Sequence, residues 1–320
     1  MELEQPKLKF FKEILGLNPA STAFKQVLKN VFGEEDVPPT RFGLSSLKQL
    51  HLKSIKLWRG KFHFERKIII TNLFNHKPTP LSKGWSVKKT QMQDFRGKEL
   101  TYDSHNGTDF SVPVGTLVVA PAKGKIVKIA REFNRGGLKI FIDHGGGLMT
   151  TFAHLSRPLV RLGEILDHGS AIALSGYSGV DGLITFPFGI PHIHFNTWLN
   201  GEPVDPFLLP NGKSLWINNF PMPFDKSLED NTSYIESSFN NESIKDVMLS
   251  CKTSSTLNRF NKIAKQELLA AEIISEMNYY PTRFQKRFNI YDREYDRSNC
   301  LTLPFLKETF DDVIFDDEIK

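Results

Sequence analysis

The chain has 320 residues, of which 40% are hydrophobic and 24% charged, and its formal net charge is +5. This length allows one or two domains with a substantial core, and the composition excludes a largely disordered chain. Part of the charge excess is a basic run in the first hundred residues. Such a run is typical of a solvated face; the alternative is attraction to a wall polymer, a membrane or nucleic acid. We expect no nucleic-acid partner.

Residues 1–90 are expected to form an N-terminal extension, helical and then extended. Apolar residues near a 3.6-residue period predict helix over 7–32, divided into two short helices at Asn18-Pro19. The run Ile68-Ile69-Ile70 predicts a strand within 61–74. Neither a signal-peptide core nor a stretch of about 20 apolar residues is visible. By sequence the chain is therefore expected in the cytoplasm, without a transmembrane helix.

Residues 91–210 are expected to form a β-rich domain. Short β-branched runs alternate there with glycine-containing turns such as Arg135-Gly136-Gly137. Five or more short strands at this spacing predict an antiparallel sheet. The clearest strand candidates are 116–120, 125–129, 138–142, 149–152 and 192–195.

Residues 211–320 change in character and are expected to form a partly helical C-terminal region. An amphipathic pattern predicts a helical stretch from about 257 to 278. Acidic residues crowd the last decade, which predicts a frayed tail. The two cysteines, Cys251 and Cys300, make neither a metal cluster nor a disulfide framework.

Histidine spacing is the informative feature for chemistry. His105 and Asp109 lie four residues apart, and His192 and His194 lie two apart. On a strand, residues i and i+2 project to the same face, so the second pair can reach one cleft. A catalytic zinc site takes three protein ligands at ~2.0–2.2 Å, and two imidazoles with one carboxylate satisfy that count. A His-x-His pair alone is more often a buried, hydrogen-bonded pair; its combination with His-x-x-x-Asp favours a metal.

Two other histidines have a simpler interpretation. His144 and His168 each follow an aspartate and precede a glycine, which is typical of turns. We expect structural roles for both.

A series of short motifs covers about a third of the chain and resembles the lysostaphin/LytM-type zinc metallopeptidases, a family of peptidoglycan endopeptidases. The motifs follow that family's order: His105-Asn106-Gly107-Thr108-Asp109-Phe110, Pro113-Val114-Gly115-Thr116, Ala120-Pro121-Ala122-Lys123-Gly124, Ile142-Asp143-His144-Gly145, Phe152-Ala153-His154-Leu155-Ser156, Ser175-Gly176-Tyr177-Ser178-Gly179, Pro191-His192-Ile193-His194-Phe195 and Gly201-Glu202-Pro203-Val204-Asp205-Pro206.

The resemblance implies a β-rich α+β fold, with an antiparallel-sheet metallopeptidase domain between the two flanking regions. It also implies that His105, Asp109 and His194 hold one Zn²⁺ per chain. His154 and His192 would then line the site as catalytic histidines that exchange protons with water, oxyanion or leaving amine. The division of these tasks between the two stays open.

Two positions depart from the family pattern. Asn196 stands where many relatives have an acidic residue, and we expect altered local hydrogen bonding there without loss of the metal. The loop 180–190 is longer and more apolar than usual and should border the cleft, as a pocket wall, as a lid, or by packing on the extra segments. Its neighbourhood supplies the candidates for substrate contact, Tyr177, Phe186 and Phe188.

The resemblance therefore implies a zinc metalloendopeptidase acting on peptidoglycan stem peptides or cross-bridges. Two alternatives remain: a zinc peptidase with a protein substrate, or a latent domain that binds or regulates a cell-wall partner. Either flank is a candidate inhibitory segment over the cleft. The implied substrate lies in the cell envelope, in tension with the cytoplasmic expectation, and oligomeric state does not follow from these patterns.

Overall fold

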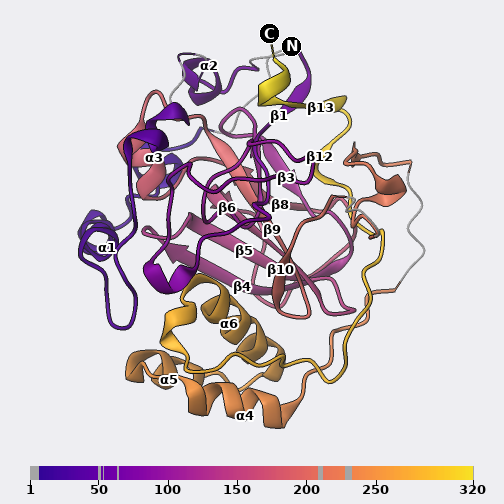
Figure 1. The fold of residues 1–320 in the computed structure, drawn as a ribbon. Coiled ribbons are helices and arrows are strands. Elements are labelled where there is room, and N and C mark those ends of the chain that lie inside the picture. The colour runs from indigo at the N-terminus through magenta and orange to yellow at the C-terminus, as the bar shows by residue number, and fades with distance from the viewer. Residues whose placement is uncertain are drawn as a thin grey trace.

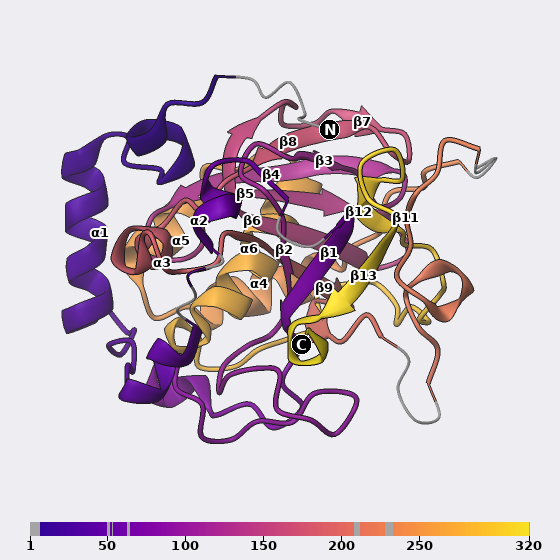
Figure 2. The ribbon, with the colours of Figure 1, turned by 90° about the horizontal axis from the view of Figure 1, so that it is seen from above.

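The computed structural model describes residues 7–49, 52, 54–62, 65–207, 212–227 and 233–319. Its centre is a large sheet, with helices packed against one face and others at the edge (Figures 1 and 2). This architecture confirms the predicted β-rich fold. Among the described residues, no helix has the length and apolar character needed to cross a bilayer.

The main sheet is 11-stranded and mostly antiparallel, with the central order β13-β1-β2-β9-β6-β5-β4-β7. All five strand candidates of the sequence lie in it, as does the strand expected within 61–74. The strands are β1 (Lys67–Asn72), β2 (Thr108–Ser111), β3 (Leu117–Val119), β4 (Gly124–Glu132), β5 (Gly137–Asp143), β6 (Leu148–Pro158), β7 (Ile165–Leu166), β8 (Ala171–Ser175), β9 (His192–Leu199), β10 (Glu202–Val204) and β13 (Asp312–Phe315). A separate pair is formed by β11 (Pro223–Phe224) and β12 (Leu303–Leu306).

In the described part of the chain, six α-helices flank the sheet. The predicted break at Asn18-Pro19 is observed, because a short π-helical turn at Phe10–Ile14 precedes it and α1 follows it. The helices are α1 (Ala20–Phe32), α2 (Ser54–Trp58), α3 (Val180–Thr185), α4 (Asn241–Ser250), α5 (Ser254–Phe260) and α6 (Gln266–Tyr279).

One expectation for the C-terminal region was confirmed with a correction, and one was wrong. The helical stretch over 257–278 is divided into α5 and α6 by a turn at 261–265, and Phe260 and α6 bury apolar faces in one core. The acidic tail is not frayed. Strand β13 pairs in parallel with β1, and Asp317 forms an ion pair with Arg96, with 3.0 Å between Nη2 and Oδ2 (Figure 2).

Both faces of the sheet are buried, and alternate residues of a strand enter different cores. Ile193 and Phe195 of β9 belong to the core that contains Trp216 and Phe305. Trp198, on the other face of β9, belongs to the core formed with α4, α5 and α6. The histidines of β9 share the face of Trp198, so the site lies on the side that the C-terminal helices cover (Figure 1).

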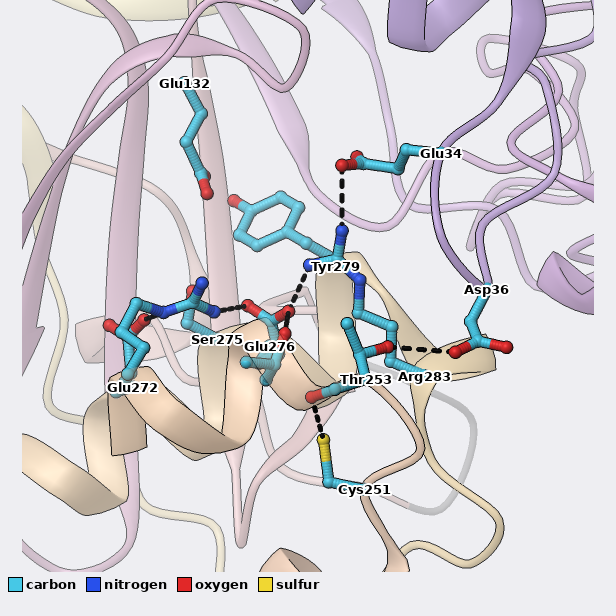
Figure 3. A network of polar contacts seen from close by, with 12 residues as sticks. Glu34, Asp36, Glu132, Cys251, Thr253, Glu272, Ser275, Glu276, Tyr279 and Arg283 are labelled. Carbon is cyan, nitrogen blue, oxygen red and sulfur yellow. Dashed lines mark hydrogen bonds and ion pairs between the residues drawn. The ribbon is translucent and has the colours of Figure 1, made fainter. Parts of the chain in front are cut away.

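A buried ion network fastens the N-terminal extension to these helices (Figure 3). Its centre is Glu276 of α6, which accepts hydrogen bonds from Arg259 and Arg283. Arg283 also forms an ion pair with Glu34, with 3.0 Å between Nη2 and Oε2. Segments more than 200 residues apart in sequence thus meet at one charged cluster.

Candidate metal site and its cleft

Sheet register brings the three predicted ligands together. Strands β2 and β9 are antiparallel neighbours, and Asp109 pairs directly with His194. His105 lies in the turn just before β2, close enough for its ring to contact that of His194 at a centroid distance of 4.9 Å. The spacing seen in the sequence therefore becomes one cluster of side chains.

The donor atoms of the cluster converge on one point. His105 Nε2 lies 3.1 Å from both Asp109 Oδ1 and His194 Nδ1, and His194 Nδ1 lies 2.7 Å from Asp109 Oδ1. One ligand atom from each residue lies within 4.8 Å of the others, an arrangement that fits a metal ion. Two imidazole nitrogens and a carboxylate oxygen are a donor set that zinc accepts.

The last residue of β1 and the residue after it orient two of these ligands. The carbonyl of Leu73 accepts a hydrogen bond from His105 Nδ1 at 2.6 Å, which fixes the tautomer and leaves the Nε2 lone pair facing the cluster. Asn72 Nδ2 donates to Asp109 Oδ2 at 2.8 Å and holds the carboxylate. The sequence analysis missed both supports; an asparagine closing the isoleucine run of a strand was the available signal.

Burial and charge set the protonation of the cluster. Burial alone would raise the pKa of the Asp109 carboxyl, but attraction to His105 and His192 outweighs it and holds that pKa well below its usual value. Burial lowers the pKa of His194. A carboxylate and a neutral imidazole are the forms that bind a metal.

His154 and His192 flank the cluster, with their ring centroids 4.9 Å apart. His154 Nδ1 donates to Ser178 O and His192 Nδ1 donates to Ile190 O, each at 2.8 Å. Both carbonyls fix the tautomer and leave Nε2 as the nitrogen able to accept a proton. Burial, with the nearby charge of His192, lowers the pKa of His154 to about 3, so this ring is neutral at pH 7.

A cavity of about 210 Å³ opens beside these histidines. Tyr177 forms part of its wall and contacts the rings of both His154 and His192. The N-terminal extension supplies another part, so one flank of the chain does border the cleft. The lining residues are Phe42, Gly43, Ser46, Val87, Tyr102, Asp109, His154, Tyr177, Asp181, Ile184, Thr185 and His192.

The structure does not place the other two loop candidates, Phe186 and Phe188, in that wall. Phe186 packs on Trp58 and Phe10 at centroid distances of 5.0 and 5.1 Å. Trp58 Nε1 also donates to Gly189 O at 2.9 Å. Of the three interpretations of the loop 180–190, packing on the N-terminal extension describes these residues, while Ile184 and Thr185 face the cavity.

Asn196 links the site to the C-terminal region. Its Nδ2 donates to Asn106 O at 2.8 Å, which holds the turn after His105. Its Oδ1 accepts a hydrogen bond from Tyr279 of α6 at 3.2 Å. Asn196 therefore connects the turn after His105 to α6, and Tyr279 is a supporting residue that no local sequence pattern marked.

Comparison with known proteins finds a family model that matches the segment containing this site. Residues 103–206 match the model of Peptidase family M23. The chain is 38% identical over 102 residues to an "Uncharacterized metalloprotease" of Haemophilus influenzae, covering 32% of this chain and 20% of that protein. It is 35% identical over 117 residues to "Peptidoglycan DD-endopeptidase ShyB" of Vibrio cholerae, covering 36% and 25%.

A solved zinc-containing peptidase from Vibrio cholerae is 28% identical, with 46% of this chain and 40% of that chain covered at a TM-score of 0.33. The chain thus spans a fifth to a quarter of the length of the two curated relatives. The family match contains every predicted ligand and both flanking histidines, and it confirms the resemblance seen in the motifs.

Proposed function

We propose that the chain is a zinc-dependent metalloendopeptidase that hydrolyses peptide bonds in peptidoglycan stem peptides or cross-bridges. The observation that carries this proposal is the convergence of His105, Asp109 and His194 within 4.8 Å, in a segment matched to a peptidase family. The substrate class is supported by the relative named a peptidoglycan DD-endopeptidase.

Zinc would be held by His105 Nε2, Asp109 Oδ1 and His194 Nδ1. When bound, such an ion polarises a carbonyl and lowers the pKa of its water towards ~7. The chain's own contribution begins with the ligands: burial keeps His105 and Asp109 away from competing water, and the Leu73 carbonyl fixes the tautomer of His105.

His154 and His192 would handle protons and the developing negative charge. Each ring donates Nδ1–H to a backbone carbonyl, so Nε2 is the atom that can take a proton from a water or return it to a leaving amine. Burial holds the pKa of Tyr177 above its usual value, so its hydroxyl stays protonated beside both rings.

Digestion of purified sacculi tests the proposal. Mass spectrometry should find released fragments with new amino and carboxyl ends within stem peptides or cross-bridges, and the His192→Ala variant should release almost none. A denatured protein substrate is run in parallel. If the protein is cleaved while the sacculi stay intact, the alternative in which the zinc peptidase acts on protein is favoured.

A further inference from the structure

A groove of about 660 Å³ lies between the sheet and the C-terminal region, apart from the histidine cavity. Pockets of this size hold small molecules or short peptide segments. One wall comes from the loop between β1 and β2, and the other from the end of α6 and the chain after it. The lining residues are Phe74, Asn75, Pro78, Thr79, Pro80, Leu81, Ser82, Ser104, His105, Asn106, Pro203, Lys252, Asn278, Pro281, Thr282, Phe284 and Arg287.

The groove reaches the candidate metal site. His105 and Asn106 lie at its edge, and Asn106 also lines a smaller cavity together with His194 and Tyr279. On α6, Asn278 faces the groove and the next residue, Tyr279, faces the smaller cavity. Because Asn106 lines both spaces, the groove and the smaller cavity adjoin at this residue.

The groove has an apolar lining and a cationic rim. Phe74, Leu81 and Phe284, with several prolines, supply the apolar wall. The cations are Lys252 and Arg287, whose side chains are 37% and 35% exposed.

Both cations have partly exposed ion-pair partners within the chain. Lys252 Nζ lies 3.7 Å from Asp36 Oδ1, whose side chain is 31% exposed. Arg287 Nη2 lies 2.9 and 3.0 Å from the two carboxylate oxygens of Glu202, whose side chain is 60% exposed, and 3.4 Å from Asn278 Oδ1. Exposed ion pairs contribute only ~0–1 kcal/mol, so a ligand carboxylate can replace either partner at little cost.

We propose that this groove is a recognition site for the part of the substrate peptide remote from the cleaved bond, and that Arg287 and Lys252 bind its free carboxylates. The inference rests on the proposed function, because it names the feature of the substrate that the same enzyme recognises. The C-terminal region thereby contributes specificity, while the sheet contributes the metal site. An arginine binds a carboxylate through two parallel N–H groups, which makes Arg287 the principal contact.

The test measures binding apart from hydrolysis. A stem pentapeptide with free carboxylates and the same peptide with every carboxyl amidated are titrated into the full-length Asp109→Ala protein by calorimetry, with Arg287 intact or changed. Arg287→Ala should weaken binding of the free-carboxylate peptide about tenfold, the effect of losing one charge-assisted contact, and leave the amidated peptide unchanged. Arg287→Lys keeps the charge and should restore part of the loss, which separates recognition from misfolding.

Arg161→Ala is the matched control, because Arg161 is an exposed arginine outside the groove. It should bind both peptides as the parent does. Equal weakening of both peptides by Arg287→Ala, an equal effect of Arg161→Ala, or no carboxylate preference in the parent would overturn the inference. The proposed function is tested separately, by hydrolysis of sacculi and by the zinc content of the wild type. Failure of the groove inference can therefore be distinguished from failure of the proposed function.

Discussion

The sheet and the C-terminal region meet around the same site but are built in different ways. In the sheet, the ligands come from two short motifs whose register is fixed by β2 and β9, so Asp109 and His194 are adjacent by backbone pairing alone. In the C-terminal region, Tyr279 at the end of α6 reaches the site through a hydrogen bond to Asn196, and Arg287 lines the neighbouring groove. The metal ligands therefore come from local sequence motifs, whereas the residues that support the site and line the groove beside it lie far from those motifs in sequence.

The largest expected effect is on the sheet side. His192→Ala should lower kcat by about 10²- to 10⁴-fold, the usual contribution of a positioned acid or base, because the proton-handling ring is lost. Zinc content should stay near the wild-type value, since His192 is not among the three converging ligands. Steady-state kinetics with metal analysis on the same samples measures both, and loss of the metal together with activity would contradict these separate roles.

The next effect is on the C-terminal side. Glu276→Ala removes the acid between Arg259 and Arg283 and should destabilise the protein by about 1.5–3 kcal/mol, because both arginines lose their bond to a buried carboxylate and keep only Glu272 and Glu34 (Figure 3). Urea unfolding gives the free energy. Glu294→Ala, at an exposed position of the same region, is the control and should change the stability by less than about 0.5 kcal/mol.

A smaller effect tests whether the two regions are coupled. Tyr279→Phe removes the hydroxyl that donates to Asn196 while keeping the ring against Trp198. Loss of one hydrogen bond of about 0.5–1.5 kcal/mol should weaken zinc binding by roughly 2- to 10-fold, because the Asn106 turn beside His105 loses support. Competition with a chelating dye measures this affinity.

Tyr291→Phe is the matched control for that experiment. Its buried hydroxyl has no hydrogen-bond partner among the described residues, and it lies in the same core. Its zinc affinity should equal that of the wild type. If Tyr279→Phe and Tyr291→Phe have the same zinc affinity, α6 does not support the Asn106 turn beside His105.

A further effect is a pH dependence within the sheet, at the turn between β5 and β6. His144 donates from Nδ1 to Lys123 O at 2.7 Å and accepts at Nε2 from Thr150 at 2.8 Å, so the ring is neutral. Burial lowers its pKa from 6.5 to about 4. Between these values the unfolded chain binds a proton that the folded chain does not, so stability should fall as the pH drops from 6.5 to 4.

The slope from this one group is at most about 1.4 kcal/mol per pH unit. His144→Gln should reduce the slope measured by urea unfolding across this range. An unchanged slope would show that His144 is not the titrating group.

The contrast between the regions also explains what the sequence could predict. Strands such as 138–142 were predictable because alternation and glycine turns are local, and the ligands because His105, Asp109 and His194 lie in recognisable motifs. The turn within 257–278 was missed because apolar periodicity continues through it. The ordered tail was missed because its order comes from pairing with β1, about 245 residues away in sequence.

The supports of the site follow the same rule. Asn72 and Leu73 act on the ligands across a strand pair, and Tyr279 acts from a helix at the other end of the chain. A single sequence carries no local signal for such distant contacts. Phe186 was assigned to the cleft for its place in the loop, but its partners Trp58 and Phe10 come from the N-terminal extension.

The central claim is that His105, Asp109 and His194 form a zinc site. Its most direct test is the zinc content of the purified, metal-supplemented wild type beside Asp109→Ala and the control Asp246→Ala, an exposed aspartate on α4. We predict about one zinc per chain in the wild type and the control, and close to none in Asp109→Ala, with all three proteins folded. A folded wild type without zinc, or an Asp109→Ala protein that retains it, would contradict the account.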